Sequence, residues 1–257
     1  TPDELPTTGP AAAPAAEAAP AKGPWKVSPE VDDTFTTLHG FLSQELDFTP
    51  DEGEERRRAE LLYELGHLEE VVFGDGGRAR ERYELAAGTD ATFVPALRAL
   101  GRHYRKERRW RQVVEVLDAE LKTSSTEEQR AALAVQIGAL LWHRLEDGEG
   151  AVASLEQAQQ LSPRARRSLE LLRLIYSRQH DWEPLFGVLG RLCNISADDG
   201  ERARLTVELA ELAEVRLGRP QEAEELYAHA LELDPANQKA ALALRRLYLH
   251  HERWQQL

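Results

Sequence analysis

The fold is decided by residues 97–110, which read LRALGRHYRKERRW. The same pattern returns at residues 169–182 as LELLRLIYSRQHDW and at residues 241–254 as ALALRRLYLHHERW. Within each copy, apolar residues recur every three or four positions, which is the period of a helix with one buried face. A short polar turn then leads to a tryptophan, and a second apolar run follows. The pattern therefore predicts pairs of helices joined by short turns.

These copies belong to an internal repeat of 72 residues that runs without gaps from Arg58 to the end of the chain. Other positions that recur with it are Leu100, Leu172 and Leu244, Tyr104, Tyr176 and Tyr248, and Ala86, Ala158 and Ala230. A position that favours a small residue recurs at alternating intervals of 35 and 37 residues, at Gly66, Gly101, Gly138, Arg173, Ala210 and Arg245. Each unit therefore contains two slightly different helical hairpins. Since no stretch alternates with period two, we predict an all-α chain.

The repeat resembles the tetratricopeptide repeat family. The residues that carry the resemblance are Leu97, Leu100, Gly101 and Tyr104 on the first helix, and Ala223, Tyr227, Ala230 and Pro235 in the second part. Over residues 31–257, the resemblance implies a right-handed α-solenoid of about five and a half stacked antiparallel hairpins, truncated in mid-repeat at the C-terminus. Arg173 and Arg245 stand where the family has a small residue, so we expect alternate hairpins to pack more widely.

The first 30 residues differ in composition from the rest of the chain. Six of the 13 prolines lie before residue 25, interleaved with alanine, and few apolar residues accompany them. We therefore expect residues 1–30 to form a flexible linker. Methionine is absent even from position 1, so we expect the chain to be a piece of a longer protein. The excess of arginine over lysine indicates a bacterial source. We expect a cytoplasmic location, with the alternative that an N-terminal signal preceded Thr1.

Composition excludes several classes of function. The net charge of −13 argues against nucleic-acid binding, which depends on lysine and arginine at phosphates. No apolar run is long enough to span a membrane. The single cysteine, Cys193, excludes an internal disulfide and a cysteine-rich zinc site. The eight histidines are scattered and no nucleophile motif appears, so we predict a non-catalytic chain without metal or cofactor.

The candidate binding surface lies on the first helices of the hairpins, which should line the concave groove of the resembled fold. The candidate partner-binding residues are Arg98, Arg102, Arg105, Lys106, Trp142, His143 and Arg178. They should form a basic tract that Val135 and Arg167 complete. Trp142 stands out because Glu70 and Glu214 occupy the equivalent positions. The alternative is that the arginines only complement a helix C-terminus and stay solvated.

Three functions remain open on this evidence. The first is a non-catalytic scaffold that binds a protein or peptide, with an acidic peptide as a candidate. The second is a regulatory or substrate-recruiting arm of a larger enzyme or of a secretion or assembly machine. The third is an RNA-binding helical repeat, which the acidic balance disfavours. The open C-terminal end, with Leu242, Leu249 and Trp254, is also a candidate for self-association.

Overall fold

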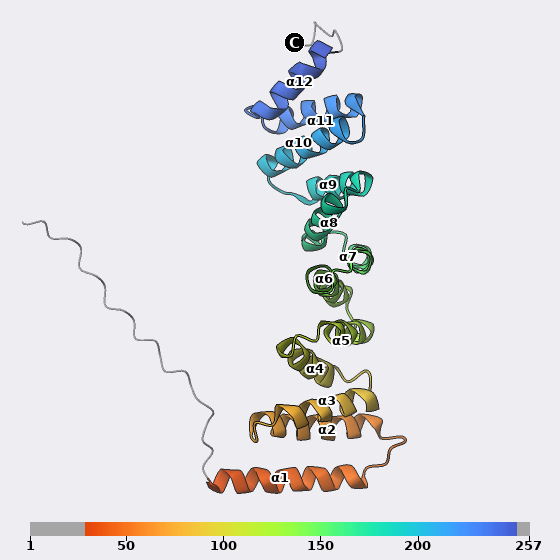
Figure 1. The fold of residues 1–257 in the computed structure, drawn as a ribbon, viewed down its shortest axis with the longest axis vertical. Coiled ribbons are helices and arrows are strands. Elements are labelled where there is room, and N and C mark those ends of the chain that lie inside the picture. The colour runs from red at the N-terminus through yellow and green to blue at the C-terminus, as the bar shows by residue number, and fades with distance from the viewer. Residues whose placement is uncertain (1–28, 251–257) are drawn as a thin grey trace, which may run out of the picture.

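The computed structural model describes residues 29–250, which form twelve helices and no strand (Figure 1). The helices are α1 (Pro29–Phe48), α2 (Glu55–Val71), α3 (Gly76–Thr89), α4 (Val94–Lys106), α5 (Trp110–Thr123), α6 (Glu127–Arg144), α7 (Gly148–Leu161), α8 (Arg166–Gln179), α9 (Trp182–Ile195), α10 (Asp199–Val215), α11 (Pro220–Leu233) and α12 (Gln238–His250). The predicted all-α class is confirmed. None of the described helices combines the length and apolar character needed to cross a bilayer.

The helices stack along one long axis, from α1 at one end to α12 at the other (Figure 1). Short turns join them into the hairpins α2–α3, α4–α5, α6–α7, α8–α9 and α10–α11, and each hairpin packs on its neighbours. This is the arrangement of a helical solenoid, in which one hairpin buries its apolar face only against the next.

The two kinds of hairpin differ in how closely their helices approach. A Cβ atom added at Gly66 would lie 2.9 Å from the Tyr83 ring, and one added at Gly138 would lie 2.7 Å from Leu155. At Gly101 the nearest atom would be 3.8 Å away, an ordinary contact. The α2–α3 and α6–α7 hairpins are accordingly packed more extensively than α4–α5 and α8–α9. The expected wider packing of alternate hairpins is thus confirmed, and α8 accommodates Arg173 at the position of Gly101.

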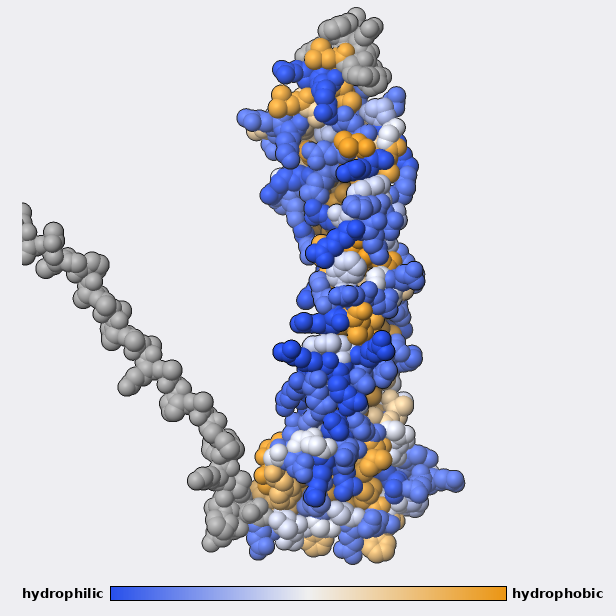
Figure 2. Space-filling model, in the orientation of Figure 1, coloured by the Kyte–Doolittle hydropathy of each residue, from blue (hydrophilic) through white to orange (hydrophobic). Residues whose placement is uncertain are grey.

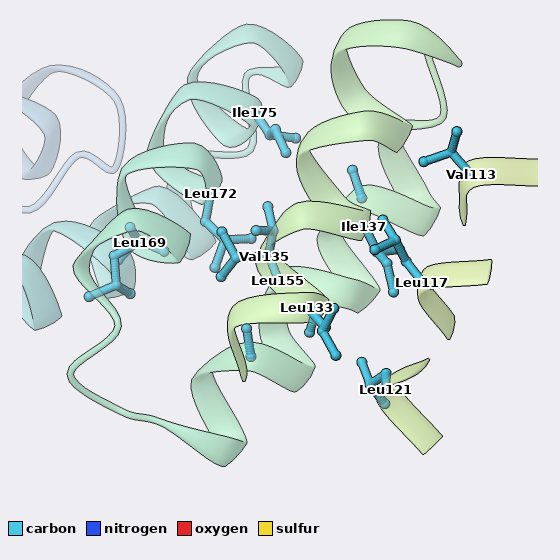
Figure 3. Packing of buried hydrophobic residues seen from close by; sticks show 14 of the residues in the cluster. Val113, Leu117, Leu121, Leu133, Val135, Ile137, Leu155, Leu169, Leu172 and Ile175 are labelled. Atoms are coloured by element: carbon cyan, nitrogen blue, oxygen red, sulfur yellow. The ribbon is translucent and has the colours of Figure 1, made fainter. Parts of the chain in front are cut away.

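The core follows the stack as three clusters of buried residues. One cluster extends from α3 to α10, and smaller clusters cover the two ends. Figure 3 shows the central part, where Leu117 and Leu121 of α5 point toward Leu133 and Ile137 of α6. Because this core is long rather than round, every helix has one face left over for solvent or for a partner.

The two ends of the stack bear on the predicted domain limits. Helix α1 begins at Pro29, two residues before the predicted start of the repeat domain. Leu46 is buried, whereas Phe41 is 65% exposed, so only part of α1 packs against α2. At the other end Leu242 and Leu249 of α12 are exposed. Most of the predicted linker, and Trp254 with the predicted mid-repeat truncation, lie outside the described residues.

Candidate functional site

Helix α6 forms the floor of a cleft between α4 and the start of α8. The cleft has a volume of about 670 Å³. Ala131, Val135 and Ala139 lie at helical spacing on one face of α6, so together they make an apolar floor. Arg105 of α4 and Arg167 of α8 contribute to the walls. The other lining residues are Glu128, Ala132, Gln136, Leu140, Ser162 and Ala165.

The charge of this cleft differs from that of the whole chain. Arg105 and Arg167 are exposed, and neither forms an ion pair with any residue in the described part of the chain. Glu128 is the one carboxylate among the lining residues. An unpaired guanidinium presents several N–H donors in a plane that fits a carboxylate. The cleft is therefore locally basic on a protein whose net charge is −13.

A smaller cleft of about 230 Å³ adjoins the first along α4 and shares Arg105 and Gln136 with it. Arg98 and Arg102 line this second cleft. Arg98 is engaged, since its Nε lies 2.7 Å from Oε1 of the buried Glu120. Arg102 forms no ion pair with the described residues. The predicted arginine face of α4 thus lies along two joined clefts, with one arginine neutralised.

The remaining predicted residues lie elsewhere. The Nζ atom of Lys106 lies 3.7 Å from Oε1 of Glu70, on the side of α4 that faces α2. Trp142 is half-buried against the core, and the guanidinium carbon of Arg178 lies 5.8 Å from its ring centre. His143 is exposed. None of these four predicted residues lines either cleft. The structure therefore does not bring the whole predicted tract together: the arginines of α4 line the clefts, Trp142 and Arg178 contact each other between α6 and α8, and Lys106 pairs with α2.

The position of Trp142 is explained by its counterpart one repeat unit earlier, Glu70. Glu70 accepts a hydrogen bond from the Tyr83 hydroxyl at 3.1 Å and lies 3.2 Å from Nε2 of His103. Burial raises the pKa of Glu70, but His103, Tyr83 and Lys106 together outweigh burial and hold the pKa below its ordinary value. The carboxylate thus joins α2 to both α3 and α4.

One unit after Trp142, Glu214 repeats this arrangement. It accepts a hydrogen bond from the Tyr227 hydroxyl at 3.3 Å and lies 2.6 Å from a guanidinium nitrogen of Arg246. In the middle unit Trp142 replaces the carboxylate and contacts Arg178 through its ring. The 72-residue comparison detects this exchange, but it does not detect the partners. Trp142 therefore links α6 to α8, at the position where Glu70 and Glu214 link the helices of their own units.

The described residues offer no evident catalytic arrangement. No group of three or more His, Cys, Asp or Glu side chains in this part of the chain is placed to hold a metal ion. Burial raises the pKa of the Cys193 thiol, which disfavours the reactive thiolate. Hydrophilic side chains cover most of α4 to α8 on the face shown in Figure 2, as expected of a solvated surface.

The chain is similar to a known family over one segment and to several solved structures. Residues 214–256 match the tetratricopeptide repeat family. Among solved structures, YrrB, described as a TPR protein with an unusual peptide-binding site, is 16% identical, with 83% of this chain and 99% of that chain covered and a TM-score of 0.43. The MamA protein is 19% identical over 70% of this chain and 94% of that chain, with a TM-score of 0.44. PilF of Pseudomonas aeruginosa is 13% identical over 86% of this chain and 98% of that chain, with a TM-score of 0.40. No curated protein matches the sequence.

Proposed function

We propose that this tetratricopeptide repeat chain is a non-catalytic scaffold. Its α6 cleft would bind an acidic segment of a protein partner. The observation that carries the proposal is the pair of unpaired guanidiniums, Arg105 and Arg167, on the walls of an apolar cleft. In the described residues most other arginines of the first helices already have carboxylate or aromatic partners. These two are available to a ligand.

The chemistry of the cleft defines the ligand. Two guanidiniums favour carboxylates, which they bind through charge-assisted hydrogen bonds. The floor of alanine and valine side chains favours small apolar groups between the acidic ones. The ligand would be an extended or helical peptide segment, and the two arginines that would hold it stand on helices α4 and α8 rather than on loops. Arg98 and Arg102, in the adjoining cleft, would extend the contact along α4.

The expected affinity is modest. Exposed ion pairs contribute about 0.2–1 kcal/mol each, so two or three such pairs act together with the apolar floor. Salt should weaken binding, because the charges are exposed to solvent. The protein as a whole repels an acidic peptide, since its net charge is −13. Binding of such a peptide would therefore indicate a local site rather than the average charge.

The experiment uses a labelled peptide in which glutamate alternates with alanine and valine, and a second peptide with lysine at every glutamate position. Fluorescence anisotropy should show salt-sensitive binding of the first peptide only. The variant Arg105→Glu/Arg167→Glu should abolish it. The control is Arg111→Glu/Arg191→Glu, which changes two exposed arginines of α5 and α9 that form no ion pair in the described structure.

Both variants change the net charge equally, so they share the same long-range repulsion. Equal loss of binding in the two would mean that only total charge matters, and the proposed site would then be wrong. Unchanged binding in Arg105→Glu/Arg167→Glu would also refute it. Circular dichroism must first show that both variants keep the helicity of the parent.

A further inference from the structure

A larger cleft lies one repeat unit beyond the first, between α8, α10 and α12. Its volume is about 860 Å³. Several of its lining residues stand 72 positions after residues of the first two clefts: Ser177 follows Arg105, Glu208 follows Gln136, and Lys239 follows Arg167. The repeat therefore builds the same opening twice. The side chains that line the second opening are different, which indicates a different ligand.

Most charges of this cleft are paired with one another. A guanidinium nitrogen of Arg173 lies 2.7 Å from Glu208, and one of Arg246 lies 2.6 Å from Glu214. The guanidinium of Arg216 covers the indole ring of Trp182, with 4.8 Å between the guanidinium carbon and the ring centre. Ser177 replaces the unpaired Arg105 of the first cleft. A charged ligand would have to break these pairs, so the cleft favours an uncharged one.

Apolar side chains occupy the rim of this cleft where the preceding unit carries polar ones. Leu242 of α12 is 58% exposed, and its counterparts are Arg98 and Glu170. Val215 of α10 is 67% exposed, and its counterpart in the preceding unit is His143. The rim is therefore apolar by residue type.

Leu242 is exposed because of its position in the repeat, and not because α12 is the last described helix. Its counterparts Arg98 and Glu170 lie on α4 and α8, which are each followed by a complete second helix, and both are nevertheless exposed. A second helix packed on α12 would accordingly leave Leu242 open. Exposed aliphatic side chains that line one cleft offer an apolar contact surface.

The structure assigns to this cleft the binding of an uncharged aliphatic segment of a protein partner, held between Leu242 and Val215 over Leu185, Leu189 and Leu212. The assignment rests on the proposed scaffold function only in that the ligand is a protein segment. The ligand class follows from the ion pairs of the cleft together with its apolar rim. The chemistry is opposite to that of the α6 cleft, so the two sites discriminate between segments.

The test uses a short capped peptide of leucine, valine and serine, labelled with an uncharged dye, beside the acidic peptide described above. Anisotropy should show that the aliphatic peptide binds and that added salt does not weaken it. The variant Val215→His/Leu242→Glu gives each position the residue of the preceding unit, so the helices should tolerate it. This variant should weaken the aliphatic peptide about tenfold or more and leave the acidic peptide unchanged.

The matched control is Val71→His/Leu85→Glu, which makes the same changes at two exposed aliphatic residues outside the cleft. The control should leave both affinities unchanged. If the aliphatic peptide fails to bind, or if the control weakens it as much as Val215→His/Leu242→Glu does, the second cleft is not its site. Binding of the aliphatic peptide without the acidic one would support this inference and refute the proposed function of the first cleft, so the two failures are distinguishable.

Discussion

The guanidinium carbon of Arg144 lies 5.0 Å from the ring centre of Trp110. The same contact recurs one unit later, where Arg216 lies 4.8 Å from Trp182. In both cases an arginine at the C-terminal end of a first helix, α6 or α10, covers the tryptophan that opens the second helix of the preceding hairpin. The 72-residue repeat thus preserves this arginine–tryptophan contact between neighbouring hairpins as well as the hairpins themselves.

Replacing the tryptophan of this contact should destabilise the stack. We expect Trp182→Ala to cost about 3 kcal/mol, near the lower end for aromatic-to-alanine changes, because the ring is only half-buried. Arg216→Ala should cost less, about 0.5–1 kcal/mol, since it removes only the cation–π contact. Urea unfolding followed by circular dichroism measures both. A larger loss in Arg216→Ala than in Trp182→Ala would contradict the packing role of the indole.

Two glycines on equivalent faces should respond in opposite directions to alanine. In Gly138→Ala the new methyl would lie 2.7 Å from Leu155, so we expect a loss of about 1–3 kcal/mol from overpacking. In Gly101→Ala the nearest atom is 3.8 Å away, and the higher helix propensity of alanine should stabilise by up to about 1 kcal/mol. Thermal unfolding of the two variants tests this directly. Equal effects would mean that the two hairpin types do not differ in closeness.

Two repeated tyrosines predict a loss of stability at alkaline pH. The Tyr104 hydroxyl donates to Glu84 at 2.9 Å, and the Tyr176 hydroxyl donates to Glu156 at 3.0 Å. Burial, and then the bonded carboxylate, raise the pKa of each tyrosine to about 12. The ordinary value is about 10, so the neutral phenols stabilise the fold fully below pH 10 or so, and this contribution disappears as pH rises toward 12.

The corresponding measurement is the urea midpoint as a function of pH in the parent and in Tyr104→Phe/Tyr176→Phe. The parent should lose stability between about pH 10 and 12, and the double variant should lose less across that window. The variant should start lower, because each lost hydrogen bond contributes about 1 kcal/mol. An identical decline in both proteins would show that these phenols do not govern the alkaline transition.

The sequence predicts the architecture more fully than it predicts the site. Period and repeat length identify the helices and the two hairpin types, because both depend on residues close in sequence or one unit apart. The partners of charged side chains depend instead on helix-to-helix placement. Arg98 therefore pairs with Glu120 and Lys106 with Glu70, and neither pair follows from spacing.

The same reason explains how the predicted binding tract divides. Arg105, Val135 and Arg167, expected on one groove, do line one cleft. Trp142 and Arg178 were expected on the same groove. The half-buried Trp142 ring instead packs against the core and contacts Arg178 between α6 and α8. Helical periodicity gives the direction of a side chain around its own helix. It does not tell how deeply the neighbouring helix covers that side chain.

The most direct test of the central claim is a charge exchange at the α6 cleft. Affinities for the glutamate peptide and for the lysine peptide are measured in Arg105→Glu/Arg167→Glu and in Arg111→Glu/Arg191→Glu, two variants of equal net charge. We expect the first variant to prefer the lysine peptide and the second to keep the parent's preference for the glutamate peptide. The same preference in both variants would contradict the claim that Arg105 and Arg167 select an acidic partner.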